Sequence, residues 1–440
     1  MRRVKYLVQT KTPLIALFTN KAFATIFFLA ALLRICIFSL LPPNTPSNLG
    51  PDEGTYGALA RWVSESKPVN DFPTYGPGLY NTARSLILPS ALFVKLGLVE
   101  IQAVRLTSLI YGLLSIVVLG ALLLLLSRLK SSDIRFSDVM AQKYFVVILI
   151  IFSFLPSNLI WSTLGLRETA SAFWIMLSFY SIVNLVKDRD NLESLLWGGL
   201  LVLSLVLSYG ARRETAFVFT VVLFLLSFYL LLTRKATVPI LALIIGLFIG
   251  QHFTSTPSPE RDNDSTFPTS VESSLKIPLQ SISNQVTTIR ILEYKRNVNR
   301  LDAQSALPES TCQKVDGAQL NVIMCNISEL PYRLFAFLFR PLPILDSGSL
   351  SLTLAGFENI FWITFLSYVI FLFFIFMRYG GSQRVLLITL GVYFAMFSTA
   401  AALYEGNLGT AFRHKSTLLW VCVTVIYISC INRESRKVST

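Results

Sequence analysis

Long apolar runs alternate with short polar connections along most of the chain. A helix needs about 20 mainly apolar residues to cross the hydrocarbon core of a bilayer, or slightly fewer where long flanking side chains reach the interface. The pattern therefore predicts an all-α polytopic membrane protein with about ten transmembrane helices. These are expected at residues 22–41, 103–127, 144–160, 169–186, 195–209, 216–232, 238–253, 359–377, 385–403 and 417–431.

Three further segments do not fit a transmembrane helix. Residues 75–98 are moderately apolar, but Gly, Pro and charged residues interrupt them, which favours helices that lie in the outer interface. Residues 254–330 are rich in Ser, Thr, Pro and Asn and are expected to form an outer loop, helical in part over 281–306. Residues 332–340 read as a short amphipathic helix that returns to the interface.

Three parts of the chain are therefore expected. Residues 1–253 would form a transmembrane module with an acidic outer loop at 42–102. Residues 254–340 would hold the polar outer loop and the interfacial helix, and residues 341–440 the C-terminal transmembrane helices.

Composition and charge agree with a membrane protein. Hydrophobic residues make up 53% of the 440 residues and the mean hydropathy is +0.60, whereas soluble domains are about 45–50% apolar. A net charge of +13 could indicate a nucleic-acid partner, but the basic residues lie in short clusters between apolar runs, so none is expected. Because Lys and Arg favour the cytoplasmic side, their distribution over alternate connections places both termini in the cytoplasm of a plasma (inner) membrane protein.

The other connections are therefore expected to face outward, and they carry the unusual polar residues. Asp52 and Glu53 follow the first apolar run, and Tyr56 comes three residues after Glu53, where it could hold a sugar or phosphate oxygen. Only one of two adjacent acids can point directly at a ligand, so the other would cap the helix or support the ligand-contacting groups without touching the ligand. Alternatively, the pair simply caps the following helix and favours its dipole.

Two outward segments combine arginine with an acid at the start of a helix. They are Arg167-Glu168 and Arg212-Arg213-Glu214. A guanidinium group offers two parallel hydrogen bonds to a phosphate, and a helix N-terminus adds its positive dipole end, so these segments suit a lipid phosphate. The alternative for each is an intramolecular ion pair at the interface.

Two further sites involve cations. Residues 405–415 join two glycines to three consecutive potential cations, Arg413, His414 and Lys415, and are expected to form an anion-binding turn or a tight outer hairpin. Arg34 lies inside the first apolar run and should face the protein interior, held by a backbone carbonyl, an acid or a ligand.

Metal and redox motifs are scarce. The two histidines are far apart in sequence and the five cysteines show no CxxC spacing, which argues against a His-based metal centre and against a zinc or redox site. No cofactor is predicted, although one of the outward acids could hold a divalent cation. Cys312 and Cys325 share a polar loop and could form a disulfide in an oxidising compartment.

These motifs resemble the GT-C superfamily of polytopic glycosyltransferases, which includes protein mannosyltransferases and the enzyme that adds aminoarabinose to lipid A. The resemblance covers about the first 250 residues. It comprises the arginine in the first run, the acidic pair and tyrosine after it, the segments 75–80 and 103–106, Glu168 and the turn 209–214. Short C-terminal motifs at 337–343, 358–359 and 407–415 are similar to segments of membrane proteins from surface-polysaccharide gene clusters, including proteins assigned as polymerases.

The resemblance implies an inverting glycosyltransferase on the outer membrane face that uses a polyprenyl-phosphate or polyprenyl-diphosphate donor and adds its sugar to a cell-envelope glycan or glycolipid. It also implies that Asp52 is the general base, and a carboxylate in this role contributes about 10²–10⁴-fold. The cations would stabilise the departing phosphate, and Glu53, Glu168 and Glu214 would orient them. Three alternatives remain open: a polymerase of lipid-linked repeat units, a flippase or other transporter for polyprenyl-linked glycans, and a non-catalytic scaffold.

Overall fold

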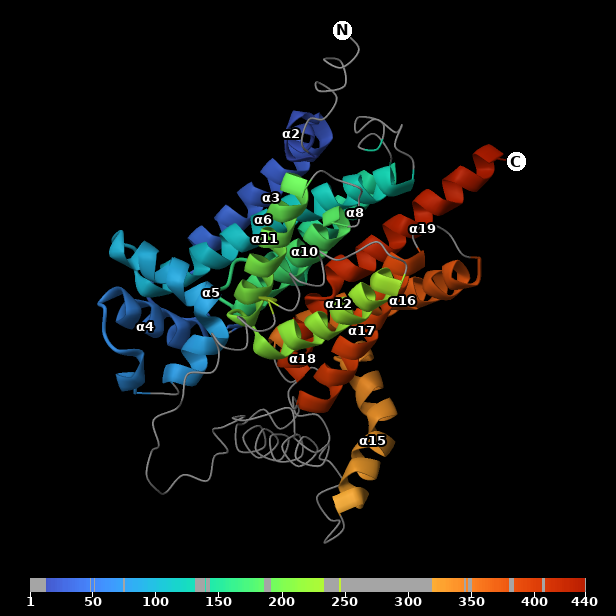
Figure 1. Ribbon diagram of the computed structural model, residues 1–440. Helices are drawn as coiled ribbons and strands as arrows, with labels where there is room; N and C mark the ends of the chain where they lie inside the picture. Colours follow the sequence, from blue (N-terminus) through green and yellow to red (C-terminus); the bar gives the residue numbers. More distant parts are fainter. Residues whose placement is uncertain are drawn as a thin grey trace. The chain divides into compact units, whose positions relative to one another are not determined.

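The computed structural model is helical throughout its described part (Figure 1). It describes residues 13–47, 49–50, 52–73, 76–130, 139, 143–185, 191–232, 245–246, 319–343, 346, 350–379, 384–405 and 408–439. None of these residues lies in a β-strand, so the predicted all-α class is confirmed for this part of the chain. Of the outer loop expected over 254–330, residues 254–318, which include Cys312, lie outside the described residues, and residues 319–330 are helical.

The chain divides into two compact units. The first unit comprises Met1–Thr254, Val369–Val392 and Leu419–Thr440, and the second comprises Ser255–Tyr368 and Tyr393–Leu418. The N-terminal helices of the first unit are α2 (Pro13–Thr19), α3 (Lys21–Leu40), α4 (Asp52–Ser64), the short 3-10 helix η1 (Val69–Asp71), α5 (Gly76–Lys95), α6 (Glu100–Lys130), α8 (Lys143–Phe154), α9 (Pro156–Trp161), α10 (Arg167–Leu185), α11 (Asn191–Tyr209) and α12 (Arg213–Leu232).

The remaining helices belong to the C-terminal part of the chain. The second unit holds α15 (Gln319–Phe339) and α18 (Leu408–Ser416), and α19 (Leu419–Ser439) belongs to the first unit. Two helices, α16 (Leu350–Tyr379) and α17 (Arg384–Tyr404), contribute residues to both units.

Nine of the ten predicted runs fall on described helices, and the run 238–253 lies almost wholly outside the described residues. Within the described part, six helices are long and apolar enough to cross a membrane, which supports a multi-pass membrane protein but does not reach the predicted ten. They are Lys21–Leu40, Glu100–Ser127, Leu192–Tyr209, Leu352–Ile375, Arg384–Leu403 and Leu408–Ile431.

Three predicted elements need correction. The run 144–160 is not one helix, because Leu155 adopts extended backbone angles before Pro156, which cannot continue the α8 hydrogen-bond ladder. The amphipathic helix expected from residue 332 begins at Gln319, so α15 is 21 residues long. The segment expected to form an anion-binding turn is largely helix α18.

A small apolar core holds the N-terminal part of the first unit together. Helix α6 packs against α4, α5 and α10, and α10 packs against α11 (Figure 1). Buried side chains from α4, α5, α6 and the segment before α10 form one cluster: Tyr56, Leu59, Ala60, Ala83, Leu86, Ile87, Val104, Leu164 and Leu166. The cluster fixes the first turns of α4 and α10 relative to each other.

Helix α5 ends at a glycine that turns the chain directly into α6. Gly97 has a φ of +97°, a conformation that favours glycine, and the Leu98 N–H donates to the Phe93 carbonyl over 3.1 Å. This is a Schellman-type helix end, and it makes α5 and α6 a close pair.

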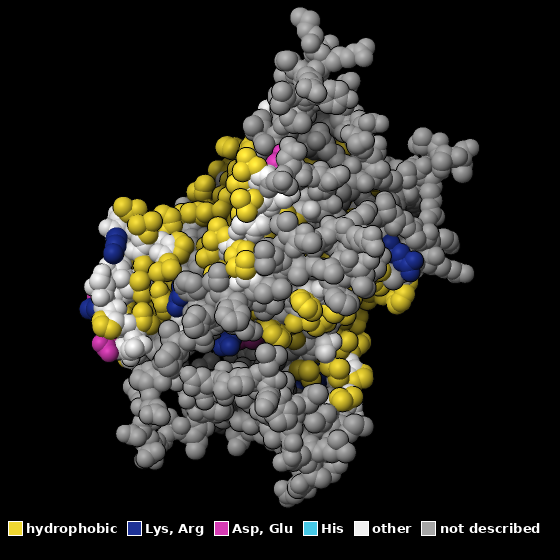
Figure 2. All heavy atoms as spheres, viewed as in Figure 1, with side chains coloured by type: hydrophobic (Ala, Val, Ile, Leu, Met, Phe, Trp, Pro, Cys, Tyr) yellow, Lys and Arg dark blue, Asp and Glu magenta, His cyan; other side chains and the backbone are white. Residues whose placement is uncertain are grey.

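Apolar side chains also cover much of the outside of the first unit. Phe28, Leu29, Leu32 and Leu33 of α3 are exposed, as are two leucines of α5 and Leu96 directly after it. Figure 2 shows hydrophobic side chains gathered over this part of the molecule. An exposed apolar surface of this kind suits contact with lipid.

Candidate active site

Three helix N-termini of the first unit bring charged side chains together. Arg167, the first residue of α10, interacts electrostatically with Asp52 and Tyr56 of α4, with Glu168 beside it, and with Glu214 of α12. Side chains that are widely separated in sequence thus surround one guanidinium group. This set includes five of the predicted site residues.

The environment of Arg167 keeps the residue charged. Burial alone would lower the pKa of this partly exposed arginine, but the surrounding Tyr56, Glu214, Glu168 and Asp52 outweigh burial and raise the pKa above its ordinary value. A permanent cation at a helix N-terminus is a suitable partner for a phosphate.

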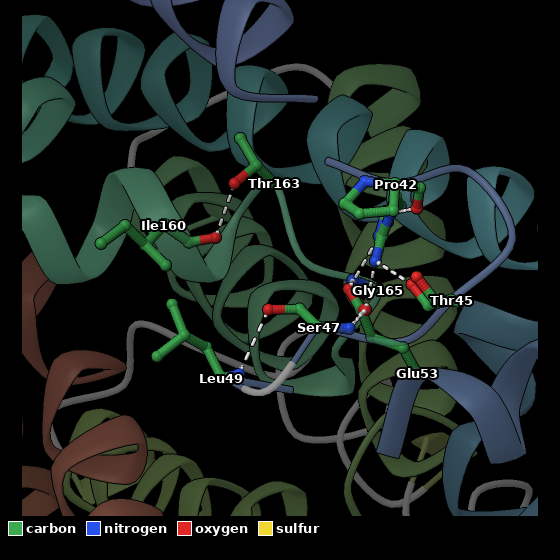
Figure 3. Close-up of polar contacts among 9 residues, drawn as sticks. Pro42, Thr45, Ser47, Leu49, Glu53, Ile160, Thr163 and Gly165 are labelled. Atoms are coloured by element: carbon green, nitrogen blue, oxygen red, sulfur yellow. Dashed lines mark hydrogen bonds and ion pairs between the residues drawn. The ribbon is translucent and has the colours of Figure 1, made fainter. Parts of the chain in front are cut away.

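The adjacent acids of α4 have different surroundings. Asp52 is exposed, whereas Glu53 is fully buried. The Glu53 carboxylate accepts hydrogen bonds from Arg105 Nε at 3.1 Å and Arg105 Nη2 at 2.7 Å. It also accepts from the Gly165 N–H at 2.9 Å and the Ser47 N–H at 2.8 Å, as Figure 3 shows. Four donors occupy the carboxylate, so Glu53 is a positioning group that ties together four segments of the chain.

The hydrogen bonds around the Glu53 carboxylate form a junction between chain segments, and Arg105 extends this junction to the residues that follow α3. Its Nη1 donates to the Pro42 carbonyl at 2.7 Å and its Nη2 donates to the Thr45 carbonyl at 3.0 Å. Gly165 can approach closely because it lacks a Cβ, since a Cβ there would come within 2.5 Å of Val104 Cγ2. The loop after α3, the first turn of α4, α6 and the start of α10 thus meet at one ion pair.

The turn between α11 and α12 adds two more guanidinium groups. Arg212 Nη1 lies 3.5 Å from Glu168 Oε1, and Arg212 Nε lies 3.9 Å from Glu214 Oε2. Both distances exceed the roughly 2.7–2.9 Å of a tight charge-assisted hydrogen bond, so these ion pairs are loose. Arg213 is partly exposed at the start of α12.

The predicted C-terminal cations lie in the second unit and have partners there. Lys415 is fully buried. Its Nζ donates to the Leu338 and Arg340 carbonyls at 3.2 Å each and to Asn359 Oδ1. Since an ammonium group has three donors, these acceptors occupy it, and Lys415 caps the C-terminal end of α15.

The other two residues of that segment differ in exposure. His414 is buried and forms an ion pair with Glu405, in which the histidine is charged only if protonated. Arg413 is partly exposed, and its Nη2 lies 3.3 Å from Thr410 Oγ1. Arg413 is therefore the member of this group most available to a ligand.

Arg34 is buried within the protein, as expected. It donates to Ser162 Oγ at 2.8 Å and to the carbonyls of Ala30 and Ser153 at 3.2 and 3.1 Å. These bonds join α3 to α8 and to the residues after α9, which indicates a structural role.

Sequence reasoning did not single out Arg105 as a functional residue. The available signal was its position near the start of the second apolar run, where a cation is costly unless it meets an acid or other hydrogen-bond acceptors. For metals, no group of three or more His, Cys, Asp or Glu side chains within the described ranges is arranged to hold an ion.

Comparison with known proteins gives little further information. No protein-family model matches the chain, and no curated protein matches it. The crystal structure of ArnT from Cupriavidus metallidurans in the apo state is similar, with 12% sequence identity over 93% of this chain and 76% of that chain. The TM-score is 0.41, which is too low to carry ArnT's site or chemistry over to this chain.

Proposed function

We propose that this protein is an inverting membrane glycosyltransferase that takes a sugar from a polyprenyl phosphate or diphosphate and transfers it to a hydroxyl of a glycan or glycolipid. The observation that supports this most strongly is the meeting of three helix N-termini, with their acids, around Arg167. The proposal includes a site on the outer membrane face and both termini in the cytoplasm.

Asp52 is the proposed general base. It is the exposed member of the acidic pair, and the buried Glu53 next to it anchors the first turn of α4. Asp52 would accept the proton of the acceptor hydroxyl while the acceptor oxygen bonds to the anomeric carbon of the donor. The bond between that carbon and the phosphate oxygen breaks on the opposite face, and its electron pair leaves with the phosphate.

The cations nearby would stabilise the charge that grows on the phosphate. Arg167 and Arg212 lie among acids that hold them at the N-termini of α10 and α12, and Arg213 begins α12. Preorganised donors of this kind stabilise a transition state because they need no rearrangement during the reaction. Tyr56 is buried beside Arg167 and would fix the orientation of the donor.

The test uses the purified full chain reconstituted in vesicles with a panel of polyprenyl-linked sugar donors and glycan acceptors. We expect transfer by the wild-type protein and a loss of at least about 10²-fold in Asp52→Asn. Asp71→Asn serves as the matched control, since Asp71 is an exposed acid in η1 of the same unit. Donor translocation without transfer, or full activity in Asp52→Asn, would contradict the proposal.

A further inference from the structure

Helix α5 is docked onto the candidate site through its own backbone. Pro89 has no N–H, so the Ser85 carbonyl loses its usual partner within the helix, and it accepts a hydrogen bond from Tyr111 Oη at 2.7 Å instead. The Ser85 N–H donates to the Gly210 carbonyl at 3.0 Å. These bonds fix the middle of α5 against α6 and against the turn that begins α12.

The residue before Ser85 is an arginine held at this turn. A Cβ built on Gly210 would lie 3.6 Å from the Cβ of Arg84, which places the start of the Arg84 side chain beside this turn. The Arg84 guanidinium carbon lies 4.9 Å from the centre of the Tyr80 ring, and Nη2 donates to Asn81 Oδ1 at 2.7 Å. Arg84 thus presents a partly exposed cation beside the segment that leads to Arg212.

An exposed apolar stripe extends along α5 from this cation. Leu88 and Leu92 of α5 follow Arg84 at intervals of four residues and are 45% and 57% exposed, and Leu96, directly after the last residue of α5, is 69% exposed. Residues at this spacing lie along one ridge of a helix, and the helix rises about 12 Å from Arg84 to Leu92. The opposite face of α5, with Ala83, Leu86 and Ile87, is buried in the apolar core, so the partly exposed leucines lie on the outer side of this helix.

We propose that α5 binds the lipid part of the donor. Arg84 would bind the polyprenyl phosphate group next to Arg212, and the leucine stripe would carry the adjoining part of the prenyl chain. This inference rests on the proposed function. A polyprenyl phosphate is the occupant that matches a cation at the candidate site followed by an apolar ridge, because its anionic head continues directly into a hydrocarbon chain. Helix α5 is not one of the six candidate spans, which agrees with a helix lying in the interface beside its lipid.

The experiment measures binding separately from turnover. The full chain in phosphatidylcholine vesicles is photolabelled with a benzophenone-tagged polyprenyl phosphate, and labelled peptides are identified by mass spectrometry. We expect label on residues 84–98, competed by excess polyprenyl phosphate but not by polyprenol or phosphatidylglycerol. Arg84→Gln should reduce the label about tenfold, and Arg84→Lys should reduce it less. The matched control is Lys95→Gln, which removes an exposed cation from the far end of the same helix and should leave the label unchanged.

The outcomes separate this inference from the proposed function. Equal competition by phosphatidylglycerol, or equal labelling of wild type and Arg84→Gln, would show that bulk lipid covers the stripe and would overturn the inference. Arg84-dependent labelling in a protein that transfers no sugar would support the lipid site and contradict the proposed function. A transfer activity whose KM for the donor is the same in wild type and Arg84→Gln would overturn the lipid site alone.

Discussion

Replacing Glu53 by Gln removes one charge from the enclosed ion pair beneath the candidate site. Glu53 is 0% exposed and Arg105 is 1% exposed, and the carboxylate accepts four hydrogen bonds. The glutamine side chain keeps one acceptor oxygen, whereas its NH₂ group would face other donors. Removing one partner of a buried pair leaves an uncompensated charge and costs about 3–5 kcal/mol. We expect the free energy of unfolding of Glu53→Gln to fall by that amount.

The assay is denaturant unfolding of each variant in the same detergent, followed by circular dichroism. Glu65→Gln is the matched control, because Glu65 also pairs with two cations, Arg61 and Lys67, but at the surface, where such pairs contribute little. The double variant Glu53→Gln with Arg105→Gln should recover part of the loss, since it leaves no unpaired charge. If Glu53→Gln unfolds at the same denaturant concentration as Glu65→Gln, the reasoning about this junction is wrong.

Three further predictions concern the other charged groups. Lys415→Met should destabilise the fold by about 3 kcal/mol in denaturant unfolding, because two carbonyls and an amide oxygen lose their donor, whereas the control Arg413→Gln should have little effect. Burial alone would raise the pKa of Asp346, but the hydrogen bonds from Arg340 and the Leu342 N–H, together with the charge of Arg340, outweigh burial and hold the pKa below its ordinary value. The Asp346 carboxylate therefore stabilises the fold above about pH 4 and loses this effect as the pH falls through the lowered pKa, so the thermal unfolding temperatures of wild type and Asp346→Asn should converge as the pH falls below that pKa. Arg167→Gln should lower the single-turnover transfer rate about 10²–10³-fold, and an unchanged rate would exclude it from the site.

The helices that could be predicted from the sequence are those that follow from the length of an apolar run. Runs such as 103–127 and 385–403 coincide with helices because about 20 apolar residues can bury their backbone in lipid only as a helix. A count of apolar residues ignores local backbone limits, which is why it missed the break at Pro156. It also missed the first turns of α15, where polar residues such as Asn321 interrupt the helical spacing of apolar residues in the sequence.

The convergence of charged groups at the candidate site could be predicted in part, because charges at the start of apolar runs are costly unless they meet a partner. This reasoning singled out Asp52, Arg167 and Arg212, whose charged groups lie in one region of the structure. Sequence could not show that Glu53 pairs with Arg105, since that contact joins residues 52 positions apart. Nor could it show that Lys415 points into the protein, because its acceptors are carbonyl groups that any residue provides.

The central claim is that the N-termini of α4, α10 and α12 act together on one lipid-linked phosphate. The most direct measurement is an experimental structure of the protein in lipid with a polyprenyl phosphate bound. The account predicts the phosphate within hydrogen-bond distance of Arg167 or Arg212, with Asp52 facing the same space. A phosphate bound away from all three helix N-termini, with these residues held in separate ion pairs, would contradict it.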